Sequence, residues 1–204
     1  MRVTDPSTGK TFFSKRRLRF DDGMAPRELT FSCYHRYCFL DHDRTRHWMI
    51  EALEEARAAW PIWLWAYVIM PEHVHLLVAP REPGVEVGRF AGFVKQKVAR
   101  RAINWLEQHA PEWLPRITVR EGARLRRRFW QPGGGYDRNV HEVSTLFAMI
   151  EHIHANPVRR GLCERAVDWH WSSARWYDGE TVIPIAMDRT LPTLHKPVSG
   201  RETT

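Results

Sequence analysis

His73 and His75 are the residues of this sequence whose type and spacing most directly suggest chemistry. Pro71 ends the apolar run 62–70 just before them, and a second apolar run follows over 74–78, which predicts two strands joined by a hairpin. Side chains alternate along a strand, so both imidazoles should share one face while the apolar residues between them face the core. Paired imidazoles suit a metal ion, because each ring keeps a second nitrogen for an orienting hydrogen bond. The spacing alone fits a polar sheet face equally well.

The segments around this hairpin alternate between strand and helix patterns. Apolar periodicity and Pro or Gly breaks predict a strand over 29–40, a helix over 44–60, strands over 62–70 and 73–79, a helix over 85–109, an extended segment over 116–120 and a helix over 139–155. Asp137 or Asn139 could cap the last helix. This order predicts an α+β fold, an antiparallel sheet with helices on one face and the His pair on the other, open to ligands.

The helix expected over 139–155 combines an apolar stripe with polar residues. The stripe, which should face the core, consists of Val143, Leu146, Phe147, Ile150 and Ile153. His152 and Asn156 lie one turn apart and roughly opposite it, so their face is either solvent or part of a site. The loop over 132–139 before this helix holds three glycines and Tyr136. Because glycine widens the choice of backbone conformations, this loop should fix Tyr136 only weakly.

The charge distribution predicts a polyanionic partner. Net charge is +7 and the isoelectric point is about 9.7, and the basic residues are clustered, which points to nucleic acid. The candidate phosphate contacts are Lys95, Arg101, Arg124, Arg126, Arg127 and Arg128, with Trp130 as an aromatic ring for stacking on bases of a single strand. A solvated basic edge strand is the alternative explanation.

Length and composition predict one domain with extensions. The expected parts are a basic extension over 1–27, a domain over 28–178 and a tail over 179–204; the extension is either an arm on nucleic acid or a disordered terminus. We find neither an apolar run of about 18 residues nor a signal peptide, so the protein is expected in the cytoplasm, with the nucleoid and without a membrane partner. The three cysteines favour neither a zinc pair nor a disulfide framework.

Four motifs in this order resemble the REP-associated tyrosine transposases, bacterial relatives of the single-tyrosine HUH transposases of small insertion sequences. The motifs are MPEHVHLL over 70–77, Trp130 with Gln131, IHANPVRRGL over 153–162 and DWHWSSA over 168–174. The resemblance covers about residues 28–178. It implies an RRM-like, or ferredoxin-like, antiparallel sheet with the architecture of HUH transposases.

The resemblance also implies a metal site and a substrate. His73 and His75 match the family's two metal ligands and Asn156 matches its polar third ligand, with Mg²⁺ or Mn²⁺ as the ion. The ion polarises the scissile phosphate of single-stranded DNA, and a helix-borne tyrosine attacks it to leave a 5′-phosphotyrosine link. Substrates implied by the family are hairpins of repetitive extragenic palindromes with their single-stranded flanks.

The sequence departs from the family at the nucleophile. The family's tyrosine stands four residues before the asparagine, and here that residue is His152. His152 could be a nucleophile through a phosphoramidate, a fourth metal ligand, or the mark of an inactive copy. Tyr136 is the other candidate nucleophile, or else a packed loop aromatic. Because His152 shares a helix face with Asn156, the sequence favours the lost tyrosine, so that His152→Tyr should create cleavage.

Three hypotheses about function follow. The first is a metal-dependent transposase that cleaves and rejoins single-stranded DNA near hairpins. The second is a catalytically inactive relative that still binds DNA hairpins. The third is an RNA-binding module, because an aromatic and basic sheet face would also stack RNA bases. A covalent protein–DNA adduct in Mn²⁺ would distinguish the first from the other two.

Overall fold

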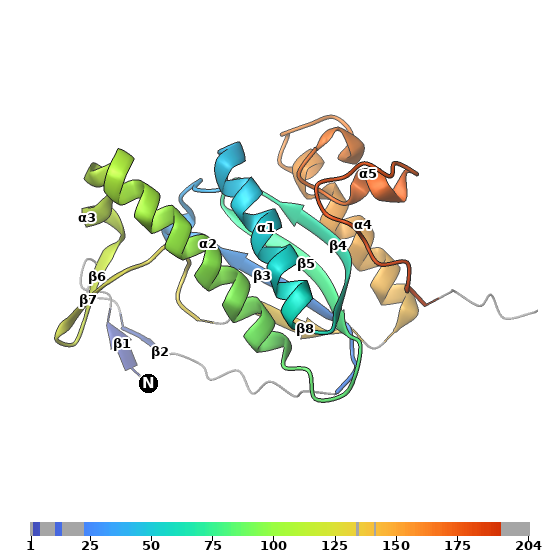
Figure 1. Cartoon of the computed structure of the whole chain (residues 1–204), viewed down its shortest axis with the longest axis horizontal. Helices are drawn as coiled ribbons and strands as arrows, with labels where there is room; N and C mark the ends of the chain where they lie inside the picture. The colour runs from blue at the N-terminus through green and yellow to red at the C-terminus, as the bar shows by residue number, and fades with distance from the viewer. Residues whose placement is uncertain (1, 5–10, 14–22, 134, 141, 193–204) are drawn as a thin grey trace, which may run out of the picture.

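The computed structural model describes residues 2–4, 11–13, 23–133, 135–140 and 142–192. Its centre is a four-stranded antiparallel sheet in the order β4-β5-β3-β8 (Figure 1). The strands are β3 (Arg27–Ser32), β4 (Ile62–Ile69), β5 (His73–Pro80) and β8 (Tyr136–Asn139). The hairpin of β4 and β5 lies where the sequence predicts it, and the α+β class is confirmed.

Two long helices, α1 (Asp43–Ala59) and α2 (Val87–His109), lie side by side across one face of the sheet (Figure 1). Both agree with the predicted helices to within a few residues. Their apolar side chains form one core with the alternate residues of the strands, including Leu29, Phe31, Met49, Leu53, Val74, Leu76, Val78, Phe90, Val94 and Val98. Burial of this apolar surface packs one face of the sheet against the helix pair. It therefore fixes which strand side chains point toward the opposite face.

Helix α4 (Val143–Arg159) packs on the opposite face, which corrects the expectation that helices cover one face only. Its side chains Leu146, Ile150 and Ile153 share a second core with residues of β4 and β5 such as Trp65 and Leu77. The α4 stripe therefore buries against the strands, as its periodicity predicts. Because α4 covers β4 and β5, β3 and β8 form the more open half of this face.

The strand predicted over 29–40 ends at Ser32. Cys33 donates its backbone N–H to the Glu72 carbonyl at 2.8 Å, and the chain then turns through a short 3₁₀ helix, Tyr34–Arg36. His35 and Arg36 adopt positive φ angles of 50° and 55° within it. Non-glycine residues rarely adopt this conformation, so the turn carries strain beside the end of the hairpin.

The segment between α2 and β8 contains more local structure than the sequence predicts. A 3₁₀ turn (Pro111–Trp113) and a short helix α3 (Leu114–Ile117) precede the strands β6 (Thr118–Glu121) and β7 (Arg124–Arg127). β6 and β7 pair with each other as a separate two-stranded ribbon. The extended segment expected over 116–120 therefore begins as a helix and becomes a strand only at Thr118.

The glycine-rich segment corrects a second expectation, because residues 136–139 form the edge strand β8 and not a loop. β8 pairs with β3, and Tyr136 lies opposite Thr30. Helix α4 begins only at Val143, with Glu142 before it, so neither Asp137 nor Asn139 caps it. Pairing with β3 satisfies the backbone of this segment with hydrogen bonds that a loop would have to find in solvent.

The free edge of β4 is covered by the C-terminal part of the chain. After a 3₁₀ turn (Ala166–Asp168), the backbone N–H of Ile69 donates to Trp171 O, and the short helix α5 (Ala174–Tyr177) follows. Beyond residue 178, Ile185 is buried in the main core and Asp188 accepts a hydrogen bond from the Leu64 backbone. These contacts hold residues after 178 against the sheet and its core.

Parts of the predicted extensions lie outside the described residues, namely 1, 5–10, 14–22 and 193–204. Within the predicted extension over 1–27, β1 (Arg2–Thr4) and β2 (Thr11–Phe13) form an antiparallel pair. Among the helices described, none has the length and apolar character needed to cross a bilayer.

Candidate functional site

His73 and His75 share the face of the sheet that α4 covers, as strand alternation predicts. Their ring centroids are 4.9 Å apart and the rings are nearly perpendicular. Nδ1 of His73 lies 3.1 Å from Oε1 of Glu72, and Nδ1 of His75 lies 2.8 Å from Oγ1 of Thr30. No hydrogen bond within the described residues engages Nε2 of either ring. Metal-binding histidines have this arrangement, in which one nitrogen is oriented by the protein and the other binds the ion.

The electrostatics of this pair favour the neutral, ligand form of His73. Burial lowers the pKa of His73 to about 4, and the charge of His75 acts in the same direction. Burial alone would raise the pKa of Glu72, but the hydrogen bond from Arg160 at 2.7 Å and the charge of His73 outweigh it, so the net shift is downward. Ionised Glu72 can only accept, so Nδ1 of His73 carries the proton and Nε2 has the free lone pair.

Helix α4 presents three successive turns to the His pair. The ring of His152 lies 6.4 Å from that of His75, and Arg160 binds Glu72, the partner of His73. Residues four apart share one side of a helix, so Asn156, which lies between these two contacts, also faces the His pair.

Asn156 is buried next to the apolar stripe and not opposite it, which corrects the sequence prediction. Its Nδ2 donates to the backbone carbonyls of His152 at 2.8 Å and Ile153 at 3.3 Å. These bonds fix the amide and leave Oδ1 as the acceptor that could reach an ion. Its role as a third ligand stays a prediction.

Across the described ranges, no cluster of three or more His, Cys, Asp or Glu side chains is placed to hold a metal ion. An ion at the His pair would therefore complete its coordination with the amide oxygen of Asn156, water and substrate phosphate. Mg²⁺ and Mn²⁺ suit such a site, because Mg²⁺ usually keeps several waters and both accept oxygen ligands. The residues fit a loosely held ion of this kind better than a closed structural site.

The two candidate nucleophiles line the same cavity. Its volume is about 410 Å³, and its walls are Glu28, Tyr136, Arg138, Thr145, Ala148, Met149 and His152. Thr30 pairs with His75 on one side and with Tyr136 on the other, so the three side chains form one row across the sheet. Neighbouring strands are about 4.8 Å apart, which places the backbones of Tyr136 and His75 roughly 10 Å from each other. A phenol ring can span much of that distance.

The environment of His152 disfavours it as a nucleophile. Burial lowers the pKa of His152, and Arg159 and His75 add to the shift, so the ring is neutral and has one lone pair. Nη1 of Arg159 lies 2.9 Å from Nδ1 of this ring. A guanidinium only donates hydrogen bonds, so it occupies the lone pair that attack on a phosphate would need.

The predicted basic contacts are less free than the sequence suggests. Arg101 binds Glu51 and Glu55 of α1, on the layer opposite the His pair, so it is not a contact near that site. On the β6–β7 ribbon, Arg127 binds Glu107, and both Arg126 and Arg128 bind Glu121. Arg124 is exposed on β7. Exposed ion pairs are weak and can exchange a carboxylate for a phosphate.

Lys95 and Trp130 both have partners within the fold. Nζ of Lys95 binds the Gly133 carbonyl at 3.0 Å. Trp130 is 7% exposed, packs edge-on against Phe31 and donates from Nε1 to the backbone carbonyl of Lys95 at 2.8 Å. Its ring is therefore part of the core and not a surface for stacking bases.

Sequence reasoning missed three residues of this site. Glu72 lies within the motif over 70–77 and directly precedes His73, but its acidic side chain gave no sign of this contact. Arg160 stands four residues after Asn156, and this helical spacing could have revealed it. Thr30 gave no signal, because its contact with His75 depends on the pairing of β3 with β5.

The fold and the site define an α+β protein with an RRM-like sheet and paired imidazoles on one face. No family model matches the chain. A curated protein of Haemophilus influenzae named "Putative REP-associated tyrosine transposase" is 25% identical over 154 residues, 72% of this chain and 82% of that protein. A solved REP-associated tyrosine transposase bound to a REP hairpin matches 87% of this chain and 93% of its own at 17% identity, with a TM-score of 0.62. The resemblance is confirmed: this chain is similar to the REP-associated tyrosine transposases in sequence and fold.

Proposed function

We propose that this protein is a transposase-type enzyme that cleaves and rejoins single-stranded DNA beside a hairpin. The observation that carries the proposal is the His pair, in which the protein orients Nδ1 of both His73 and His75 and leaves Nε2 for an ion. The name of the curated relative and the REP hairpin bound to the solved relative support DNA as the partner. A net charge of +7 is consistent with that partner.

In this proposal Nε2 of His73 and His75 and Oδ1 of Asn156 hold Mg²⁺ or Mn²⁺. Bound there, the ion would act as a Lewis acid on a phosphate oxygen. Glu72 keeps the His73 ring in place and Thr30 does the same for His75. Arg160 ties Glu72 to α4, so the helix that bears Asn156 is held against the strand that bears the His pair.

We assign the nucleophile to Tyr136. Its phenol oxygen would form a bond to phosphorus, the bond to the 3′ oxygen of the preceding nucleotide would break, and the phenol proton would be transferred to that oxygen. The products are a 5′-phosphotyrosine and a free 3′-hydroxyl. The cross-strand row with Thr30 and His75, and the cavity shared with His152, support this assignment.

The experiment uses a hairpin oligonucleotide with single-stranded flanks, labelled at its 3′ end, incubated with the protein and Mn²⁺. Because the tyrosine is joined to the 5′ end of the downstream fragment, the 3′ label should migrate with the protein on a denaturing gel. EDTA, His75→Ala and Tyr136→Phe should each remove this band. Tight hairpin binding without any adduct would contradict the proposed cleavage activity.

That outcome would support a second function, a hairpin-binding relative without cleavage. The replacement of the family tyrosine by His152, together with the Arg159 contact that occupies its lone pair, favours this alternative.

A further inference from the structure

A second cavity lies on the α1–α2 side of the sheet, between the start of α1, the end of α2 and the segment after β3. Its volume is about 290 Å³. Five of its lining residues are phenylalanine or tryptophan, and the residues that matter here are Phe39, Arg44, Trp48, Trp105, Trp113 and Phe129. Neither the metal site nor the cavity of Tyr136 includes any of them.

The aromatic rings of this pocket are not sealed in the core. Phe39, Trp48, Trp105 and Trp113 are each only partly buried. Leaving large apolar rings open to water costs free energy that a flat ligand would recover by covering them. A volume near the lower end of the usual range for ligand pockets, about 300 Å³, suits one planar ring system and not a long ligand.

Two guanidinium groups cover aromatic rings of the pocket. Arg44, which lines the pocket, lies over the ring of Trp105 at 3.7 Å from its centroid, and Arg116, which is outside the lining, lies over Trp113 at 4.8 Å. His109 also stacks on the Trp105 ring, at 4.8 Å between centroids. In the part of the chain that the structure describes, neither forms an ion pair with a carboxylate. An aromatic pocket edged by uncompensated guanidinium groups is complementary to a planar ring that carries a phosphate.

The pocket is adjacent to the hairpin turn that carries His73. The backbone N–H of Leu40 donates to the Pro71 carbonyl at 2.8 Å, so Phe39 on the pocket wall lies next to this turn. Arg36, whose side chain is 65% exposed, lies on the same connecting segment and contacts Glu72 at 3.5 Å. A DNA strand that leaves the metal site over this turn would pass a cation before reaching the aromatic rings.

We propose that this pocket takes one unpaired nucleobase of the bound DNA. The base displaces Arg44 from the Trp105 ring, on which His109 also stacks, and stacks there and on Trp113, while Arg44 and Arg116 bind its phosphate. The inference rests on the proposed function for its DNA partner and adds where one base of the strand is held. Stacking on aromatic rings tolerates any base, so the pocket selects an unpaired position and not a sequence.

The test is a double-mutant cycle between the protein and the DNA. Hairpin oligonucleotides carry one abasic site at each unpaired position in turn, and their affinities are measured for the unmodified protein and for Trp105→Ala. One abasic position should weaken binding to the unmodified protein by about 5- to 100-fold and have little further effect on Trp105→Ala.

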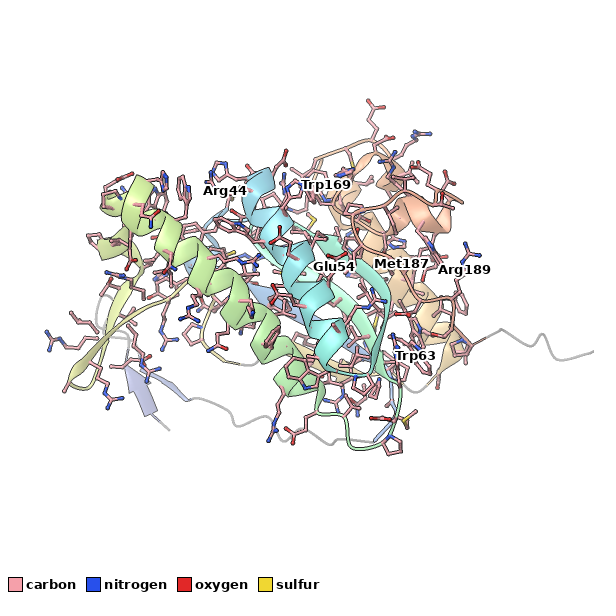
Figure 2. All side chains as sticks on the ribbon, viewed as in Figure 1. Arg44, Glu54, Trp63, Trp169, Met187 and Arg189 are labelled. Atoms are coloured by element: carbon pink, nitrogen blue, oxygen red, sulfur yellow. The ribbon has the colours of Figure 1, made fainter. Side chains whose placement is uncertain are left out.

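Two further variants separate binding from folding. Arg44→Gln changes an exposed side chain, so the fold should persist while affinity falls and the log–log salt slope decreases by about 0.7. Trp63→Ala is the matched control, because Trp63 is a half-buried tryptophan on β4, remote from Arg44 (Figure 2). It should bind every oligonucleotide like the unmodified protein, and circular dichroism should show that all three variants are folded.

The outcomes distinguish this inference from the proposed function. If Trp105→Ala and Arg44→Gln bind normally, or if no abasic position is coupled to Trp105, the pocket does not hold a base and the inference is overturned. The inference is also overturned if the unmodified protein forms a dimer and Trp105→Ala is a monomer, because the pocket then binds a second copy of the chain. A further outcome is that the abasic position and Trp105→Ala are coupled on a linear strand and on a hairpin alike while no adduct forms in Mn²⁺. The base-binding inference is then supported and the proposed cleavage activity is contradicted.

Discussion

The rings of His75 and His152 lie 6.4 Å apart at an interplanar angle of 85°, and this contact joins strand β5 to helix α4 at the site. The family resemblance implies a tyrosine at position 152, where this sequence has a histidine. The structure therefore brings the substituted position to the His pair, and the consequences of the substitution can be tested directly.

The first prediction concerns metal binding. Mn²⁺ should raise the melting temperature of the unmodified protein, and an ion concentration 100 times its dissociation constant corresponds to about 2.7 kcal/mol of stabilisation. His73→Ala and His75→Ala should remove this shift. His47→Ala, which changes an exposed histidine of α1, should retain it. Equal shifts in all four proteins would place the ion elsewhere.

The second prediction concerns Glu72, which orients the ring of His73. Glu72→Gln keeps the shape of the side chain but loses the charge that holds His73 Nδ1–H and Arg160. Mn²⁺ affinity, measured by calorimetric titration, should fall about 10- to 100-fold. Glu54→Gln is the control, because Glu54 is exposed on α1 (Figure 2). Unchanged affinity in Glu72→Gln would show that His73 needs no such orientation.

The third prediction concerns Gly135, which precedes Tyr136. Its φ is +73°, and an added Cβ would overlap the backbone oxygen of Thr30. Gly135→Ala should therefore detach β8 from β3, so that β8 amides exchange faster and the DNA adduct is lost while Mn²⁺ binding persists. Gly133→Ala has a similar φ of +99° but no atom within 4 Å of the added Cβ, so it should show only backbone strain of about 1 kcal/mol. A normal adduct yield in Gly135→Ala would argue against Tyr136.

The fourth prediction separates the candidate nucleophiles. Tyr136→Phe should bind the hairpin normally and form no adduct, whereas His152→Ala should retain the adduct. If His152 attacks instead, the adduct should be acid-labile and His152→Ala should remove it. If the protein is an inactive copy, only His152→Tyr should form an adduct, and adding Tyr136→Phe should leave that gain intact. An adduct in the His152→Ala, Tyr136→Phe double variant would exclude all three mechanisms.

The fifth prediction concerns stability at acid pH. Burial lowers the pKa of His154 to about 4 from its ordinary value of 6.5, and its Nε2 lies 2.8 Å from Oγ of Ser173. Protonation therefore favours the unfolded chain, so the stability present above pH 6.5 should be lost as the pH falls toward 4, by up to about 3 kcal/mol.

Urea unfolding between pH 7 and 4, with EDTA present, measures this loss. His154→Gln can keep the hydrogen bond to Ser173 without titrating, so its stability should depend less on pH. His73, which has the same direction of shift, keeps part of the dependence in both proteins. Identical pH profiles for the two proteins would contradict the prediction.

Local periodicity in the sequence is enough to predict several parts of this protein. The period of two along β5 placed His73 and His75 on one face, and the apolar period of α1 and α2 marked their core sides. Helices α1 and α2 end two residues before Pro61 and Pro111, which cannot continue a helix, so their bounds were predictable to within a few residues. The family motifs add an expected ligand set and substrate class that periodicity alone does not imply, and both stay predictions.

Tertiary structure decided the rest, because the deciding contacts join residues far apart in the sequence. Tyr136 lies on a strand only because β3 offers its backbone an edge, and nothing within residues 132–139 encodes that partner. Trp130 is aromatic and follows a run of arginines, yet its ring packs on Phe31 in the core and offers no exposed face for a base to stack on. Asn156 is buried because α4 covers β4 and β5 instead of lying on a free face. Pairing energy between distant segments, and not local propensity, therefore determines which polar residues reach the site.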